Sequence, residues 1–304
     1  MKTTLVVPAY NEEEALPKTL DEYIDFVDEI VVVNDGSKDR TDQIATEYAR
    51  TCPKVKYIRH DVNKGKPAAL RTGVAAATGD VLIFTDADCT YPARYIPEFI
   101  KRIGKGSDIV LGARAFDKGN IPMMNKIGNT IFSTLITFFC YTKITDAQTG
   151  YRAMRKNFYP ELDVQARGLE YETKMTLRAA KLGYTITEVP IEYRKRVGKS
   201  KLNPVKDGFY MLKSIPTTIW EESTALLKSV ILVNIVLFAL GLLFGLYSVY
   251  ERITVGILSH EFYPLLSVVF IMTALQLMSF SLIMEFIINK LNKVEDLIKN
   301  MQNK

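Results

Sequence analysis

Two long uncharged stretches near the end of the chain constrain its fold most, because each is long enough to cross a membrane. Ser229–Tyr250 holds 22 residues without a formal charge, and Phe262–Met284 holds 23. A hydrocarbon core of about 30 Å needs roughly 20 such residues in a helix. We therefore expect a transmembrane hairpin over 228–290, with spans at about 229–250 and 262–288.

The charges that flank these stretches predict the orientation of the hairpin. Lys228 precedes the first span, and Lys290, Lys293 and Lys299 follow the second, whereas the linker between the spans carries one arginine. Lysine and arginine concentrate on the cytosolic side of a membrane. We expect an integral membrane protein with both termini, including a tail at 291–304, in the cytosol.

The composition limits the remaining possibilities. The chain of 304 residues is 48% hydrophobic and 24% charged, which suits a globular domain with a full core. Its net charge of +5 is not gathered in one basic block, so a membrane surface is a better partner than nucleic acid. The scattered residues Cys52, Cys89, Cys140, His60 and His260 predict neither a disulfide framework nor a zinc site. Nothing here indicates the oligomeric state.

Short apolar runs alternate with helical stretches through the first 202 residues. The runs are Thr3–Val7, Glu29–Val33, Val55–Arg59, Val81–Thr85, Ile109–Leu111 and Thr185–Pro190. The helical stretches are Glu12–Phe26, Asp39–Thr51, Lys66–Ala77 and Arg94–Ile103. This order predicts an α/β fold with a mostly parallel sheet covered on both faces. Ligands of such sheets bind beyond the carboxyl ends of the strands.

Two further segments are expected to form helices. Ile127–Tyr141 is apolar but only 15 residues long, too short to span a membrane, so it fits either a core helix or an interfacial one. Between 203 and 227, charged residues alternate with large apolar ones. That pattern is typical of amphipathic helices that lie on a membrane surface.

Polar motifs follow the first two expected strands where each strand ends. The first is followed by Pro8-Ala9-Tyr10-Asn11-Glu12, and the second by Asn34-Asp35-Gly36-Ser37-Lys38-Asp39. A short carboxylate at a strand tip accepts hydrogen bonds from a nucleotide, so we expect Asp35 to contact a base or ribose. Asp39 is expected to cap the next helix.

The run Val81–Thr85 leads directly into two carboxylates, Asp86 and Asp88. Two like charges this close are unfavourable unless a cation compensates them. Hard oxygen ligands favour Mg²⁺ or Mn²⁺ bound together with substrate phosphates. Side chains at i and i+2 of an extended chain share one side, so we expect Asp86 to face the nucleotide while Asp88 ligates the metal.

Cationic groups in two places suit the binding of phosphates. Arg114 follows the run Ile109–Leu111, so its guanidinium also projects from a strand end, where it can grip a phosphate in two places. The segment Arg194–Lys201 gathers five cations just before the membrane segments. It fits a loop that closes over a pyrophosphate, or alternatively a solvated basic face or a contact with anionic lipid.

Together these motifs resemble the GT-A fold glycosyltransferases of family 2. The likeness rests on Val7–Glu12, Asn34–Ser37, Asn63–Lys66 and Asp86–Asp88, and it covers about residues 1–202. Within that family the chain is most similar to the dolichyl-phosphate mannose and glucose synthases, through Gly112–Arg114, Asp146–Arg152, Val189-Pro190 and Arg196–Lys201. The resemblance implies that residues 1–202 form a cytosolic catalytic domain with a Rossmann-like sheet.

The resemblance also implies roles for individual residues. The nucleotide sugar would be held by Pro8, Tyr10, Glu12, Val33, Asp35, Asp86, Ala87, Asp88, Arg114, Arg196 and Lys199. Arg114, Lys126 and Asn129 would meet the acceptor phosphate, and Asp86, Asp88 and Thr90 are the candidate metal ligands. Asp86, Asp88 and Arg114 would be the catalytic residues. Mannose synthases often carry Gln where Thr90 stands, which leaves the donor sugar and one metal ligand open.

The implied reaction is a direct displacement with inversion at the anomeric carbon. It would move one hexose from GDP-mannose or a UDP-sugar to dolichyl or another polyprenyl phosphate. A divalent metal, Mg or Mn, would neutralise the leaving nucleoside diphosphate. The acceptor phosphate is already anionic near neutral pH and needs no general base, so neither Glu170 nor Glu172 is assigned that role.

Two other functions fit the same residues. The chain could be a non-processive transferase that extends a lipid-linked glycan, or a membrane protein that binds a nucleotide sugar without turnover. A processive synthase is disfavoured, because such enzymes usually carry Gln-X-X-Arg-Trp. The only tryptophan of this chain, Trp220, lies in Thr218-Ile219-Trp220-Glu221 instead.

Overall fold

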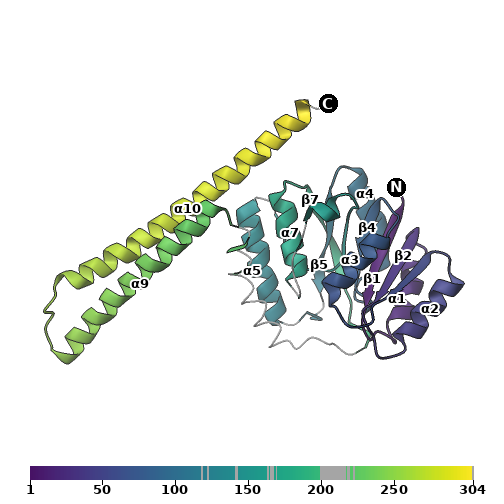
Figure 1. The fold of residues 1–304 in the computed structure, drawn as a ribbon, viewed down its shortest axis with the longest axis horizontal. Coiled ribbons are helices and arrows are strands. Elements are labelled where there is room, and N and C mark those ends of the chain that lie inside the picture. The colour runs from purple at the N-terminus through teal and green to yellow at the C-terminus, as the bar shows by residue number, and fades with distance from the viewer. Residues whose placement is uncertain are drawn as a thin grey trace. The chain divides into compact units, whose positions relative to one another are not determined.

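The computed structural model describes residues 1–117, 119–121, 123–140, 143–162, 164, 168, 170–198, 217, 220–221 and 223–302. The chain divides into two units, Met1–Ile215 and Pro216–Lys304. Figure 1 shows the sheet and helices of the first unit and the paired long helices of the second.

The described strands of the first unit form one seven-stranded sheet. They are β1 (Thr3–Ala9), β2 (Glu29–Asn34), β3 (Val55–Arg59), β4 (Val81–Phe84), β5 (Ile109–Asp117), β6 (Arg152–Arg155) and β7 (Ile186–Tyr193). Their order in the sheet is β3-β2-β1-β4-β6-β5-β7. β6 is antiparallel to both of its neighbours, and the other pairings are parallel. The predicted α/β fold with a mostly parallel sheet is confirmed.

Helices cover both faces of this sheet. One face packs against α1 (Leu16–Tyr23), α2 (Thr41–Thr51) and α4 (Ile96–Gly104), and the other against α3 (Lys66–Ala76), α5 (Met123–Cys140) and α7 (Tyr171–Lys181). Two short elements, η1 (Ala93–Tyr95) and α6 (Phe158–Leu162), complete the described helices of this unit.

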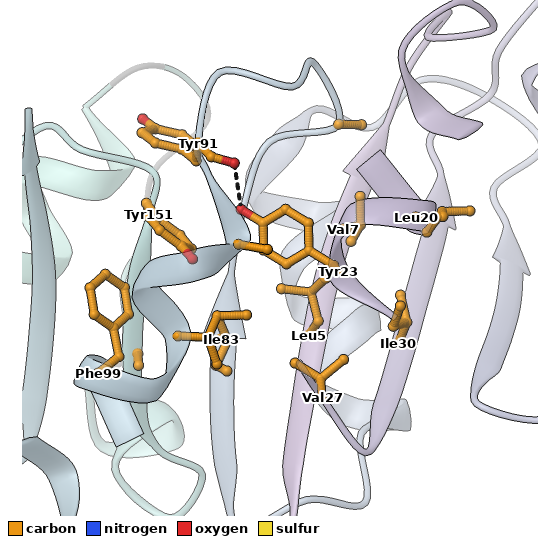
Figure 2. Close-up of a cluster of buried hydrophobic side chains, with 14 of the residues drawn as sticks. Leu5, Val7, Leu20, Tyr23, Val27, Ile30, Ile83, Tyr91, Phe99 and Tyr151 are labelled. Carbon is orange, nitrogen blue, oxygen red and sulfur yellow. Dashed lines mark hydrogen bonds between the residues drawn. The ribbon is translucent and has the colours of Figure 1, made fainter. Parts of the chain in front are cut away.

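Alternate side chains of the central strands enter different cores. In β1, Leu5 and Val7 face one core, whereas Val6 faces the other. Figure 2 shows the first of these cores, in which the Tyr23 hydroxyl donates a hydrogen bond of 2.9 Å to the carbonyl oxygen of Tyr91. Because both faces of these strands are buried, their sequences are continuous apolar runs.

The main difference from the expected fold is β6, which the sequence did not reveal. Its four residues begin and end with arginine, so the strand is too short and too polar to stand out. It inserts between β4 and β5, with Met154 opposite both Leu82 and Ile109. β5 also runs beyond its expected end at Leu111, through an irregularity between Ala113 and Phe116.

The helix expected near Ile127–Tyr141 is α5, and one of its faces is part of the core. Phe132, Ser133 and Ile136 are buried, whereas Ile127 is exposed. The interpretation of this segment as a core helix therefore holds for the face that carries these three buried residues. The amphipathic helices expected at 203–227 fall mostly outside the described residues.

The long helices described in the second unit are α9 (Ala225–Thr254) and α10 (Phe262–Gln302). By length and composition, Ala225–Thr254 and Phe262–Ser281 could each cross a membrane, with mean hydropathies of 2.6 and 1.7. The helices pack closely at Gly241, where an added Cβ would lie 2.7 Å from Ile271 Cγ1. The expected tail continues α10 as far as Gln302.

Candidate functional site

A cavity of about 430 Å³ opens where the motifs at the carboxyl ends of the strands converge. Nine of the predicted site residues line it, namely Pro8, Tyr10, Glu12, Asp35, Asp86, Ala87, Asp88, Arg114 and Arg196. The other described lining residues are Ala9, Asn63, Gly65, Lys66, Tyr91, Asn125, Gln148, Gly150, Glu172 and Tyr193. Parallel strands end at one edge of a sheet, which is why motifs far apart in the sequence meet here.

The two acidic groups that follow β4 lie in different surroundings. Asp88 is 5% exposed, and the Thr90 hydroxyl donates to its Oδ1 at 2.6 Å. Cys89 has a left-handed φ of 63°, and this sharp turn folds Thr90 back onto Asp88. Burial and the nearby charge of Asp86 raise the pKa of Asp88. A cation at this position would therefore relieve an unfavourable charge.

The guanidinium of Arg196 lies between two carboxylates of the cavity wall. Its Nη1 is 3.0 Å from Asp88 Oδ2, and its Nη2 contacts Glu12. The backbone holds the same segment in place, because Val197 N donates to the carbonyl oxygen of Asp88 at 3.1 Å. A cation predicted to meet a phosphate thus neutralises Asp88 in this structure.

Lys66 joins two carboxylates that come from distant parts of the chain. Its Nζ lies 2.6 Å from Asp86 Oδ1 and 2.7 Å from Glu172 Oε1. Burial opposes the charge on Lys66, but attraction to both carboxylates outweighs it and holds the pKa of Lys66 above its usual value. Gly150 lies against this group, since a Cβ there would be 2.9 Å from Asp86 Oδ2.

Arg114 is oriented by a bidentate ion pair with Asp146. Arg114 Nε and Nη2 each donate to an Asp146 oxygen at 2.7 Å, which leaves three N–H donors of the guanidinium outside this pair. Glu188 holds Asp146 in turn, because Asp146 N donates to Glu188 Oε1 at 2.9 Å. The guanidinium also lies over the ring of Tyr193, 5.4 Å from its centroid. The arrangement fixes a planar cation at the edge of the cavity.

The protein itself binds both oxygens of Asp35. Lys64 N donates to Oδ1 at 2.9 Å, and Gly65 N donates to Oδ2 at 2.8 Å. His60 Nδ1 lies 2.7 Å from Oδ1. Asp35 therefore anchors the loop that leads into Lys66, in addition to forming part of the cavity wall.

Several predicted site residues are not among the described residues that line the cavity. The Val33 side chain is buried beneath α3 with Ala69, and Thr90 lies behind Asp88. Lys126 is exposed, and Asn125 lines the cavity instead. Lys199 lies outside the described residues.

Asn129, which was expected to meet the acceptor phosphate, binds backbone groups of the neighbouring loop. Its Nδ2 donates to the carbonyl oxygen of Thr145 at 3.3 Å, and its Oδ1 accepts from Gln148 N at 3.2 Å. Gln148 lines the cavity, so Asn129 contributes by holding the loop that carries it.

Some residues of the site were not assigned a role from the sequence. Lys66 stands in a quoted motif, but its partner Glu172 is so distant in the chain that only the folded sheet brings them together. Glu188 and His60 lie behind Asp146 and Asp35, where sequence patterns give no signal. The signal that could have identified Tyr193 is its place directly before the cationic segment Arg194–Lys201.

The charges on the cavity wall suit a divalent cation bound with phosphates. Its described lining holds five carboxylates (Glu12, Asp35, Asp86, Asp88 and Glu172) and three cations (Lys66, Arg114 and Arg196), a net charge of −2. Within the described parts of the chain, no three His, Cys, Asp or Glu side chains converge to hold a metal by themselves. Mg²⁺ is commonly held by one or two carboxylates plus substrate phosphates, so this donor set fits such a metal.

Comparison with known proteins identifies similar chains. Residues 4–162 match the model of the family described as glycosyl transferase family 2. A dolichyl-phosphate hexose transferase of Haloferax volcanii is 36% identical, over 72% of this chain and 94% of its own length. An undecaprenyl-phosphate mannosyltransferase of Micrococcus luteus is 31% identical, over 67% of this chain and 88% of its own.

A solved structure shares the fold. The glucosyl-3-phosphoglycerate synthase of Mycobacterium tuberculosis, crystallised with Mn²⁺, UDP and phosphoglyceric acid, superposes with a TM-score of 0.56. The two chains are 20% identical, and the match covers 72% of this chain and 78% of the other. At that identity the likeness concerns the fold alone.

Proposed function

The chain belongs to glycosyl transferase family 2, and from that membership we propose that it moves one hexose from a nucleotide sugar to a polyprenyl phosphate with inversion at the anomeric carbon. The observation that carries this proposal is the convergence of Asp86, Asp88, Arg114 and Arg196 on one cavity. Similarity to transferases named for dolichyl and undecaprenyl phosphates supports the class of acceptor.

The donor nucleotide is assigned to the part of the cavity formed by the residues that follow β1 and β2. Tyr10 offers an aromatic ring to a base, and Asp35 offers an acceptor to a base or ribose donor. The diphosphate is then expected beside Asp88 and Arg196. A divalent metal held there by Asp88, with Asp86 nearby, would neutralise the leaving nucleoside diphosphate.

The acceptor phosphate is assigned to Arg114. Asp146 fixes the guanidinium plane in advance, so little ordering is needed when the phosphate binds. A phosphate oxygen attacks the anomeric carbon as the bond to the nucleoside diphosphate breaks. Because that oxygen is already ionised, the reaction leaves Glu172 free to remain paired with Lys66.

The proposed division of the chain places this chemistry next to a membrane. Residues 1–202 form the catalytic domain, 203–227 interfacial helices, 228–290 the transmembrane hairpin and 291–304 a tail, with both termini in the cytosol. α9 and α10 are long and apolar enough for the hairpin. Anchoring of this kind raises the concentration of a lipid acceptor at the site.

The proposal is tested by sugar transfer in detergent with the full chain. A panel of labelled GDP- and UDP-sugars is offered with dolichyl phosphate, with and without EDTA, to the wild type and to Asp88→Asn. One donor is expected to give a glycolipid that mild acid cleaves. EDTA should abolish its formation, and Asp88→Asn should lower the rate at least about a hundredfold.

Other outcomes would redirect the assignment. Full activity in Asp88→Asn would remove the metal role of that carboxylate. Transfer to a lipid-linked glycan but not to dolichyl phosphate would indicate a later-acting transferase. Donor binding by folded protein without release of nucleoside diphosphate would indicate a binding protein.

A further inference from the structure

A buried histidine connects three elements behind the wall of the cavity. His60 directly follows β3 and is 6% exposed. Its Nδ1 lies 2.7 Å from Asp35 Oδ1, and its Nε2 lies 2.9 Å from Thr72 Oγ1 on α3. No part of the proposed reaction uses this imidazole, although its partner Asp35 lines the cavity.

The partners of the ring determine where its protons lie. An ionised Asp35 carboxylate only accepts hydrogen bonds, so His60 Nδ1 must carry a proton. In the neutral ring, Nε2 then accepts from the Thr72 hydroxyl, and in the charged ring it donates to that oxygen instead. The bond from His60 to Asp35 is retained in both protonation states.

This bond decides which oxygen of Asp35 remains available to a ligand. Oδ1 accepts from both His60 and Lys64 N, whereas the described partner of Oδ2 is Gly65 N. A carboxylate oxygen offers about two acceptor sites. Oδ1 is therefore saturated by the protein, and the free acceptor site lies on Oδ2.

The same bond keeps the loop after β3 pressed against the exit of β2. Gly36 has a φ of 73°, and a Cβ on it would lie 2.6 Å from Asn63 N, so the two backbones touch. Asn63 and Gly65 from this loop, and Lys66 at the start of α3, all line the cavity. A small rotation of Asp35 would therefore shift both its own free oxygen and this part of the wall.

We propose that His60 is a positioning residue for nucleotide recognition, which orients Asp35 so that Oδ2 meets an N–H or O–H donor of the base or ribose. The inference rests on the proposed function, because it needs a nucleotide in the cavity. It deepens that function by assigning one acceptor atom, Asp35 Oδ2, to the nucleotide. The position of that atom is fixed by His60, whose ring is held in turn by Thr72.

The test compares variants that keep or remove the donor at Nδ1. His60→Asn retains an N–H group near that position, and His60→Leu removes it. Thr72→Val removes the group that faces Nε2, with Thr72→Ser as its control. For the full chain in detergent, the dissociation constants of GDP and UDP are measured by calorimetry, together with donor KM, acceptor KM, kcat and the melting midpoint.

We expect His60→Leu to weaken binding of the nucleoside diphosphate about tenfold or more, the effect of losing a hydrogen bond to a charged group. His60→Asn should restore binding to within about threefold of the wild type, and Thr72→Val should weaken it by about threefold, with Thr72→Ser unchanged. The weaker binding should raise donor KM, while kcat and acceptor KM stay close to the wild-type values.

Two results would overturn the role of His60 and leave the proposed function standing. One is wild-type nucleotide affinity in His60→Leu. The other is an equal fall of nucleotide affinity, kcat and melting midpoint in His60→Leu and His60→Asn, which would make His60 a residue of the fold only. If the wild type binds neither GDP nor UDP, the proposed function fails, and the role of His60 fails with it.

Discussion

Arg196 Nη1 lies 3.0 Å from Asp88 Oδ2, although 108 positions separate the two residues in the sequence. The same guanidinium contacts Glu12, so it stands among the carboxylates that would otherwise attract a divalent cation. A cation of the protein and a cation from solution therefore compete for Asp88. Binding of a phosphate-bearing ligand would favour the exchange, because it offers the guanidinium another anion.

Arg196→Gln is expected to strengthen binding of Mn²⁺ to the nucleotide-free protein by about threefold to tenfold, since Asp88 loses its competing cation. The same change should raise donor KM. Titration of Mn²⁺ followed by electron paramagnetic resonance measures the first effect. Arg194→Gln is the matched control, because Arg194 pairs with Glu22 instead of Asp88. Equal or weaker Mn²⁺ binding in Arg196→Gln would show that no such competition exists.

Gly150→Ala should damage the site without disrupting the fold. The added Cβ would lie 2.9 Å from Asp86 Oδ2 and 3.1 Å from Lys66 Nζ, so the ion pair must shift. Overpacking of this kind costs about 1–3 kcal/mol, which we expect to lower kcat/KM for the donor. Gly104→Ala, whose Cβ would come no closer than 3.6 Å to Met1 Cε, is the control. Steady-state kinetics measure the effect. Equal values of kcat/KM for the donor in Gly150→Ala and Gly104→Ala would show that the close contact at Gly150 has no role.

Asp146→Ala is expected to lower kcat/KM for the lipid acceptor by about tenfold to a hundredfold, because Arg114 loses the partner that fixes its plane. Binding of nucleoside diphosphate should change little. The control is Glu192→Gln at the exposed pair with Arg94, whose side chains are 29% and 58% exposed. Exposed pairs of this kind contribute about 0–1 kcal/mol. A loss of donor binding in Asp146→Ala as large as the loss of acceptor use would place Arg114 on the donor.

Glu29 should make the stability of the first unit, Met1–Ile215, depend on acid pH. Burial opposes its ionisation, but bonds from Lys56, Thr4 and Thr78 outweigh that effect and lower its pKa from 4.5 to about 2. A lowered folded-state pKa stabilises the fold above the unfolded value, and the contribution, at most about 3 kcal/mol, is lost as the pH falls from about 4.5 towards 2.

The measurement is the melting midpoint of the wild type and Glu29→Gln at pH 7 and pH 3. The variant should melt lower at pH 7. The gap between the two melting midpoints should narrow at pH 3, because Glu29 of the unfolded wild-type chain is protonated there while that of the folded protein stays largely ionised. Glu47→Gln, at the exposed pair with Arg50, should follow the wild type at both pH values. A gap that stays constant between the two pH values would mean that Glu29 acts through packing alone.

The parts of the fold that could be predicted are those in which local chemistry decides the structure. β3 has the expected bounds, and α3 begins at Lys66 as expected, where Pro67 suits the first turn of a helix. The side chain of Val33 could not be placed, because a strand buried on both faces shows no alternation that tells one face from the other. In the structure Val33 faces α3, and Val32 faces the opposite core.

The candidate site could be predicted where its residues lie within two positions of a strand end, as Asp35 and Asp86 do. Contacts made across the sheet could not, since they depend on which strands become neighbours. Lys66 meets Glu172 only because β6 and the segments around it complete the cavity next to β4. Asn129 shows a different limit of sequence reasoning. It is a polar residue near the site, but its side-chain amide binds backbone groups of the protein.

Because β6 inserts between β4 and β5, the sheet is completed late in the synthesis of the chain. β1, β2, β3 and β4 can pair as soon as the first 84 residues have left the ribosome, but the other edge of β4 waits for Arg152–Arg155. Until then that edge is open to pairing with other chains. A ribosome stalled before residue 152 should hold a nascent domain that engages chaperones and binds no nucleotide.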